Sequence, residues 1–217
     1  MEIKDKPHVR YNIILLVLVF TYIFIVGLLP AGQYMNELYN LIFTAIYLVA
    51  AKIISRRKSR KFFVYAGITI VAMWVSAYFK LDFISILSSF ISIIFIVVII
   101  ALMLIRLAKS KEVSLLEFVE AINIYFLMGI VASILFGIVF HYLPGESFNI
   151  SSELINPNID LIYFSFVTLS SLGYGDITPI DPIAKSLSIF VSISGQLYLT
   201  MIIAILVGKY LNKQNNN

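Results

Sequence analysis

The chain alternates between long apolar runs and short polar segments that collect most of its charges. A helix needs about 20 mostly apolar residues to cross the hydrocarbon core of a bilayer. Six runs reach or approach this length, at roughly 11–29, 38–54, 62–79, 83–105, 122–142 and 183–207. The pattern predicts an all-α membrane protein with six transmembrane helices.

Composition supports the membrane assignment. Hydrophobic residues make up 60% of the 217 residues and charged residues only 13%, and the mean hydropathy is +0.96. Soluble domains are about one quarter charged, so this chain has too few charges to cover a water-facing surface. Its net charge of +4 lies between the apolar runs rather than on one amphipathic surface, which argues against a nucleic-acid partner and favours the lipid bilayer.

The sequence contains little of what an enzyme or a resident cofactor would need. Cysteine is absent, so neither a disulfide framework nor a Cys-based metal site can form. No His, Asp or Glu lies in the middle of an apolar run. We therefore expect neither catalysis nor a bound cofactor.

The basic residues lie on one side of the predicted crossings. With the N-terminus inside, the cytoplasmic segments hold fourteen of the sixteen Lys and Arg residues. Such a bias sets the orientation of membrane proteins and predicts a multi-pass protein of the cell membrane with both termini cytoplasmic. The basic loop 56–61 fits this topogenic charge, and binding of anionic lipid is the alternative interpretation.

One outer segment, residues 143–182, does not fit a simple series of crossings. Its first part is polar and predicts a turret over 143–158. The apolar stretch that follows is too short to span and predicts a re-entrant helix over 159–170. Gly173 and Gly175 then interrupt any helix. Irregular backbone at membrane depth persists only where protein or a water-filled cavity satisfies its polar groups, so the segment predicts a pore.

The sequence YFSFVTLSSLGYGDITP, from Tyr163 to Pro179, resembles the pore of potassium channels. The Gly-Tyr-Gly-Asp part from Gly173 to Asp176 is unaltered, whereas the family's Thr-Val step is here Ser171-Leu172. The resemblance implies a filter whose carbonyl oxygens replace the hydration shell of K⁺, a mechanism taken over from the family. It also implies a homotetramer, because one strand surrounds only part of the ion. The implied ion-binding residues are Ser171, Leu172, Gly173, Tyr174 and Gly175, with K⁺ held through the first four.

The resemblance further implies residues that support the filter. Asp176 follows it and Thr168 precedes it. Tyr163 stands where many relatives carry a Trp that hydrogen-bonds the Asp after the filter. We expect the Tyr163 hydroxyl to bind Asp176, and simple packing of Tyr163 is the alternative. Asp181 either adds negative charge at the outer mouth or is a solvated loop residue.

The last apolar run carries the predicted gate. Gly195 lies nineteen residues after Asp176, where the family often has a hinge glycine. The residues that would then face the cavity are Ser192, Gln196, Leu199 and Ile203. Hydrogen bonding between helices is the alternative for the polar members of this set.

These assignments divide the chain into three parts. Residues 1–108 resemble a voltage sensor in position and helix count only, because no basic residue lies between Phe83 and Ile105, whereas steep voltage dependence needs about three to four charges per subunit. Residues 109–121 predict an amphipathic cytoplasmic linker helix. The pore domain, 122–217, comprises an outer helix 122–142, turret 143–158, pore helix 159–170, filter 171–176 and inner helix 183–207.

The predicted function is passive, selective passage of K⁺ across the membrane. Ser171 and Leu172 depart from the family pattern, and they leave open a weakly selective monovalent cation channel. A non-conducting structural subunit is the other alternative.

Overall fold

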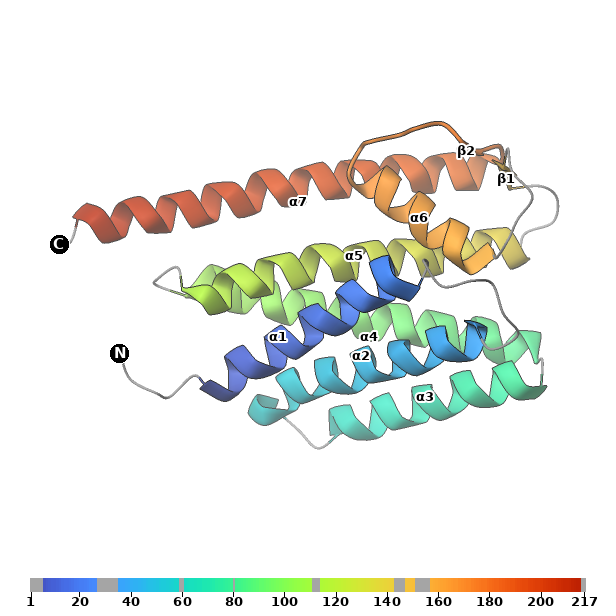
Figure 1. The fold of residues 1–217 in the computed structure, drawn as a ribbon, viewed down its shortest axis with the longest axis horizontal. Coiled ribbons are helices and arrows are strands. Elements are labelled where there is room, and N and C mark those ends of the chain that lie inside the picture. The colour runs from blue at the N-terminus through green and yellow to red at the C-terminus, as the bar shows by residue number, and fades with distance from the viewer. Residues whose placement is uncertain are drawn as a thin grey trace. The chain divides into compact units, whose positions relative to one another are not determined.

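The computed structural model describes residues 6–26, 35–58, 61–79, 81–110, 114–142, 147–150 and 157–215. These residues are mostly helical (Figure 1). In chain order the elements are α1 Lys6–Phe20, the π-helical segment η2 Thr21–Ile25, α2 Met35–Lys58, α3 Lys61–Phe79, α4 Asp82–Lys109, α5 Leu115–Tyr142, β1 Phe148–Ile150, α6 Pro157–Leu169, β2 Ile177–Pro179 and α7 Pro182–Asn215.

Three helices among the described residues are long and apolar enough to cross a membrane. They are α4 over Asp82–Lys109, α5 over Leu115–His141 and α7 over Pro182–Lys209. Two further apolar helical stretches, Val9–Ile25 and Val64–Ser76, are shorter. The chain is therefore a helical, multi-pass membrane protein, and the count of six crossings stays a prediction.

The chain divides into two compact units. One comprises residues 1–127 and 209–217, and the other comprises residues 128–208. Within the first unit α2 packs against α1, α3 and α4, and α3 packs along α4.

The core of the first unit is built on one face of α4. Tyr47 of α2 stacks on Phe95 of α4, with ring centroids 4.0 Å apart. Tyr22 of η2 meets Tyr39 of α2 edge-on at 5.3 Å, a favourable aromatic geometry. The buried residues of α4 recur every three or four positions, as one face of a helix requires; they are Ser88, Ser92, Phe95, Ile96, Ile99, Met103 and Leu107.

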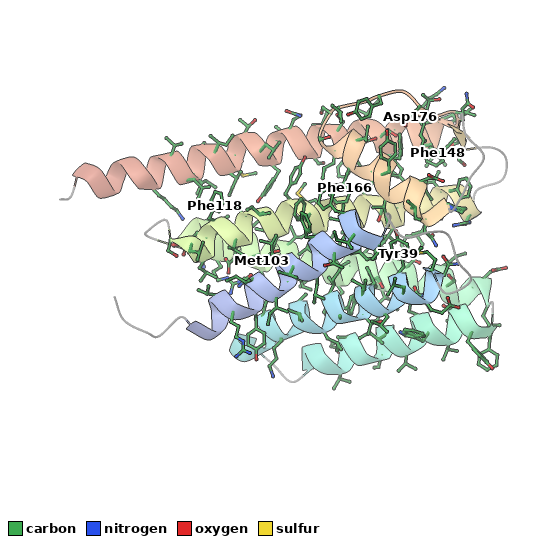
Figure 2. All side chains as sticks on the ribbon, viewed as in Figure 1. Tyr39, Met103, Phe118, Phe148, Phe166 and Asp176 are labelled. Atoms are coloured by element: carbon green, nitrogen blue, oxygen red, sulfur yellow. The ribbon has the colours of Figure 1, made fainter. Side chains whose placement is uncertain are left out.

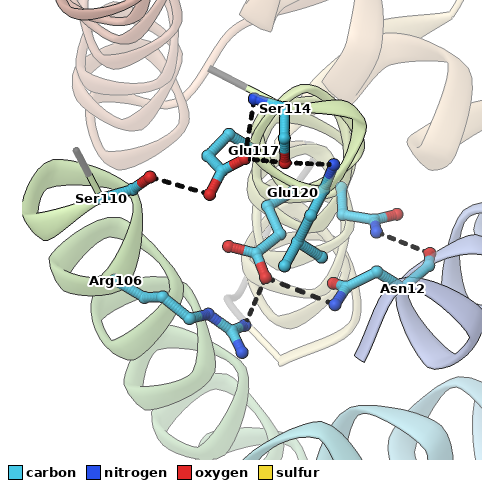
Figure 3. A network of polar contacts seen from close by, with 8 residues as sticks. Asn12, Arg106, Ser110, Ser114, Glu117 and Glu120 are labelled. Atoms are coloured by element: carbon cyan, nitrogen blue, oxygen red, sulfur yellow. Dashed lines mark hydrogen bonds and ion pairs between the residues drawn. The ribbon is translucent and has the colours of Figure 1, made fainter. Parts of the chain in front are cut away.

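A buried polar network joins α1, α4 and α5 in the first unit (Figure 3). Arg106 Nη2 lies 2.8 Å from Glu120 Oε1. Asn12 Nδ2 donates to the same oxygen at 3.3 Å, and Asn123 Nδ2 donates to the backbone oxygen of Asn12 at 2.9 Å. The sequence places Arg106 among the topogenic charges and does not predict this pairing.

The start of α5 differs from the sequence-based prediction. Ser114 Oγ accepts the N–H of Leu116 at 3.2 Å, and Glu117 Oε2 accepts the N–H of Ser114 at 3.0 Å. This capping box starts the helix at Leu115 rather than at residue 122. The linker helix predicted over 109–121 is thus not a separate element: residues 111–113 lie outside the described residues, and 115–121 are the first turns of α5.

Aromatic side chains hold α6 in the second unit. Phe164 of α6 lies 4.8 Å from Phe136 of α5 and 5.4 Å from Phe148 of β1, between ring centroids. The ring of Phe166 occupies the space that a side chain at Gly129 would need. Figure 2 labels Phe148 and Phe166 among these side chains.

Two short strands connect the segments before α6 and after the filter. β1 and β2 pair antiparallel, with Phe148 opposite Pro179 and Ile150 opposite Ile177. The sequence predicts only loop for the turret, so β1 is a new element there. The helices on either side also start earlier than predicted, α6 at Pro157 rather than 159 and α7 at Pro182 rather than 183; α7 then continues to Asn215.

Candidate functional site

The segment from α6 to the start of α7 holds all the predicted filter residues. α6 begins with Pro157, whose fixed φ suits the first helical position. It ends in a Schellman motif: the Leu172 N–H donates to the Val167 oxygen at 2.9 Å, and the Ser171 N–H donates to the Thr168 oxygen at 3.0 Å. The Thr168 carbonyl oxygen thus holds the N–H of Ser171, the first residue of the predicted filter.

Left-handed backbone recurs at every second residue beyond α6. The φ angles are +58° at Ser171, +57° at Gly173 and +82° at Gly175, while Leu172 and Tyr174 keep negative φ. Glycine adopts such angles without steric cost. Such an alternation can turn successive carbonyl oxygens toward one side of the chain, which the carbonyl filter implied by the family resemblance would need.

Of the three residues with positive φ, Ser171 is the one that is not glycine and so lacks glycine's conformational freedom. A left-handed φ is uncommon for a residue with a side chain, and it is a genuine outlier for a β-branched one. Serine therefore fits the position with less strain than the threonine found in the resembling family. Its backbone is fixed on the helix side by the Schellman motif.

The predicted contact behind the filter is present. The Tyr163 hydroxyl donates to Asp176 Oδ2 at 2.6 Å. This hydrogen bond lowers the pKa of Asp176 and raises the pKa of Tyr163 to about 12. Near neutral pH the pair is therefore a carboxylate and a protonated phenol. It ties the middle of α6 to the residue that follows Gly175.

Asp181 has a structural role that the sequence leaves open. Its Oδ1 accepts the N–H of Ile183 at 2.7 Å and that of Ala184 at 3.4 Å. Asp181 is thus the N-cap of α7, followed by Pro182 at the first helical position. This capping role belongs to neither of the two interpretations of Asp181 made from the sequence, and it does not decide between them.

One turn of α7 touches the base of the filter. Ser192 Oγ lies 2.9 Å from Ser171 Oγ, and Gln196 Nε2 donates to the Ser170 oxygen at 3.4 Å. Between them Gly195 packs against the backbone of Leu169 so closely that a β-carbon there would lie 2.9 Å from the Leu169 carbonyl carbon.

The structure thus brings part of the predicted gate to the filter. Ser192 contacts Ser171, the first residue of the predicted filter, whereas Gly195 and Gln196 contact the two residues just before it. Leu199 lies further along α7, and Ile203 is exposed there. Sequence reasoning did not identify Ser170 or Leu169 as partners of α7. The sequence around these two residues does not indicate which residues of another helix pack against them.

Comparisons with known proteins bear on this same stretch. Residues 128–212, from α5 through α6 into α7, match a family described as ion channel. Two-pore potassium channel 2 of Arabidopsis thaliana is 32% identical over 80 residues, which is 37% of this chain and 18% of the plant protein. Over these residues the chain is therefore similar to ion channels, potassium channels among them. Two pore potassium channel c of Oryza sativa subsp. japonica is 34% identical over 97 residues, 44% of this chain and 21% of the rice protein.

The match confirms the potassium-channel resemblance seen between Tyr163 and Pro179, and it supports a channel protein rather than an enzyme. The chain spans only about a fifth of the length of the two plant relatives. Potassium channel K1 of Plasmodium berghei is 39% identical over 49 residues, 23% of this chain and 2% of that protein. No group of three or more His, Asp or Glu side chains able to hold a metal ion occurs within the described ranges.

Proposed function

We propose that this chain is one subunit of a homotetrameric, potassium-selective channel of the cell membrane. The observation that carries the proposal is the left-handed backbone at Ser171, Gly173 and Gly175, in a segment that matches an ion-channel family. K⁺ would pass down its electrochemical gradient, bound through Ser171, Leu172, Gly173 and Tyr174.

The filter needs several copies of the chain because a dehydrated cation must be surrounded by oxygen atoms. One strand offers oxygens from one side only. In the single chain the side chains of Leu172 and Tyr174 are 55% and 68% exposed. Large apolar surfaces of this kind are typical of sites covered by another molecule. Further copies of the chain around a common axis would cover them and complete the ion sites.

Two electrostatic features favour a cation on this path. The C-terminus of α6 carries the partial negative charge of a helix end next to the filter base. Asp176, held as a carboxylate by Tyr163, lies just beyond the other end of the filter. The ion would thus meet negative potential at both ends of its path, at the filter base and at the mouth.

The proposed topology has six crossings with both termini in the cytoplasm. Residues 1–108 would then not act as a charge-driven voltage sensor. Arg106, at the inner end of α4, is engaged with Glu120, so it is not available as a moving charge. We expect only a shallow relation between conductance and voltage in symmetric K⁺, and a steep one would contradict this assignment.

Reconstitution of the purified full chain into liposomes tests the function. A K⁺ gradient should drive K⁺ flux, and bi-ionic recordings with K⁺ on one side and Na⁺ on the other should give a reversal potential set by K⁺. A reversal potential near zero would favour the weakly selective cation channel. Absence of flux from correctly assembled protein would favour a non-conducting subunit. Crosslinking in the same liposomes should yield tetramers.

A further inference from the structure

We propose that Ser192 is a positioning residue for the innermost ion site: its hydroxyl accepts the proton of Ser171, so that the lone pairs of Ser171 Oγ face the permeating ion. The inference rests on the proposed function. It adds a residue of the inner helix to the determinants of ion binding, although Ser192 itself would not touch the ion.

The first support is that the contact belongs to a docked surface rather than to a single chance approach. Three consecutive residues at the end of α6, Leu169 to Ser171, meet one turn of α7 between Ser192 and Gln196. The Gln196 amide donates to the Ser170 oxygen from one side of this turn. Gly195 permits the backbones to approach. Ser171 and Ser192 are therefore held at a defined separation by their neighbours.

The second support is that hydroxyl groups on the same helix behave differently. Ser188, one turn before Ser192, donates to the carbonyl oxygen of Ala184 at 2.8 Å. Thr200, two turns after Ser192, donates to that of Gln196 at 2.9 Å. Both satisfy their hydroxyl within α7, as Ser and Thr commonly do in helices. Ser192 instead lies 2.9 Å from Ser171 Oγ, a filter atom.

The direction of the hydrogen bond follows from the charge of the ion. A hydroxyl has one proton and two lone pairs. If Ser171 Oγ coordinates a cation, its proton must point away from the pore, and the Ser192 oxygen is the acceptor at hydrogen-bond distance in that direction. Without an acceptor the Ser171 hydroxyl can rotate and turn its positive end toward the ion. Ser192 would thus hold the Ser171 hydroxyl in one orientation and prevent the one in which its proton repels K⁺.

The strained backbone of Ser171 is a further reason to expect that contacts around this residue hold it in place. Its φ of +58° is unfavourable for a residue with a side chain. Strain of this kind persists where the surroundings determine the conformation from several sides. The Schellman motif fixes the main chain of Ser171, and the Ser192 contact fixes its side chain.

Block by Ba²⁺ from the cytoplasmic side tests the inference, since Ba²⁺ has nearly the size of K⁺ and a cytoplasmic blocker reaches the innermost site first. We expect Ser192→Ala to conduct K⁺ but to weaken Ba²⁺ block about tenfold, equivalent to about 1.4 kcal/mol. Relative permeability to Na⁺ should rise in the same variant. Ser192→Thr keeps the hydroxyl and should retain wild-type block. Ser188→Ala, the matched control on the same helix, should also behave as wild type.

A double-mutant cycle gives a second, independent measurement. Ser171→Gly removes the hydroxyl and suits the left-handed φ, so this variant should fold and show weakened block. On that background Ser192→Ala should have no further effect, because the group it positions is gone. Equal effects of Ser192→Ala with and without Ser171 would overturn the inference, as would wild-type block in Ser192→Ala. Absence of K⁺ flux in the wild type would instead overturn the proposed function, and this inference with it.

Discussion

Arg106 Nη2 lies 2.8 Å from Glu120 Oε1, and this ion pair joins the last turn of α4 to the second turn of α5. The Glu120 side chain is 1% exposed and that of Arg106 is 24% exposed. Glu120 Oε2 has no hydrogen-bond partner in the described part of the chain. The carboxylate therefore depends on the contacts of its other oxygen, with Arg106 and Asn12.

Loss of the arginine should cost more than loss of the glutamate. Arg106→Gln leaves a buried carboxylate without a cation, and removal of one member of a buried pair typically costs about 3–5 kcal/mol. Glu120→Gln leaves a guanidinium that still reaches water, so its effect should be smaller. The double variant should be more stable than the sum of the two losses predicts. The unfolding temperatures of the two single variants and the double variant, compared with the wild type in the same detergent, measure these effects.

Lys109→Gln is the control for this double-mutant cycle of Arg106 and Glu120. Lys109 is a basic residue of the same helical turn, and its side chain is exposed. Its replacement should leave the unfolding temperature nearly unchanged. Strict additivity of the Arg106 and Glu120 losses would show that the two side chains do not stabilise one another.

The ion pair also marks the limit of what the sequence could predict. Apolar runs located the helices, because a bilayer imposes a minimum length on each crossing. The start of α5 also has a signal in the sequence, because Ser114 and Glu117 have the spacing of a capping box. The partner of Arg106 carried no such signal, because pairing across a turn depends on how the two helices meet.

The same holds at the filter. The two glycines of the Gly-Tyr-Gly-Asp motif predicted the end of the helix, and the family resemblance predicted the bond between Tyr163 and Asp176. The left-handed φ of Ser171 and its contact with Ser192 were not predicted. Both depend on the close approach of α7 to the end of α6. Gly195 permits this approach, but the sequence does not show which residue Gly195 packs against.

The bond between Tyr163 and Asp176 should set the acid tolerance of the filter. It is fully formed above pH 3.8, the ordinary pKa of Asp, and below pH 10.0, that of Tyr. It is lost as pH falls through the lowered pKa of Asp176 or rises through about 12, the raised pKa of Tyr163. Tyr163→Phe should therefore show, at neutral pH, faster inactivation or reduced K⁺ selectivity.

Outer-side acidification of the wild type should produce the same defect only below pH 3.8. Single-channel recordings across a pH series measure both effects. Tyr78→Phe, an exposed tyrosine of α3, is the control and should match the wild type. Unchanged currents in Tyr163→Phe would mean that the tyrosine only packs behind the filter.

Gly173→Ala should test the backbone of the filter without a steric clash. A β-carbon there meets no described atom of the chain within 4 Å, but φ is +57°. The left-handed conformation should cost about 1–2 kcal/mol for a residue with a β-carbon. We expect reduced K⁺ over Na⁺ selectivity, measured from bi-ionic reversal potentials, and a lower unfolding temperature.

Gly137→Ala is the matched control for that substitution. Its β-carbon also meets no described atom within 4 Å, and Gly137 lies in α5 with ordinary helical backbone. Alanine is favoured over glycine in helices by about 1 kcal/mol, so this variant should be neutral or slightly more stable. Equal loss of selectivity in both variants would argue against a special conformation at Gly173.

Gly195→Ala separates packing from bending at the inner helix. A hinge predicts a lower open probability with unchanged ion selectivity. The structure gives a different reason for glycine, because a β-carbon would collide with the carbonyl group of Leu169 at the end of the pore helix. Overpacking of this kind typically costs about 1–3 kcal/mol. The collision should displace the filter base, so we expect reduced selectivity together with a lower unfolding temperature.

Two further variants make the comparison decisive. Gly208→Ala, in the same helix, adds a β-carbon that meets no described atom within 4 Å, and it should leave both properties unchanged. Leu169→Ala combined with Gly195→Ala should not restore selectivity, because the main obstacle is the main-chain carbonyl, which every residue at position 169 retains. Recovery in this double variant would indicate a side-chain clash instead. Wild-type selectivity and stability in Gly195→Ala, with only the open probability lowered, would favour the hinge.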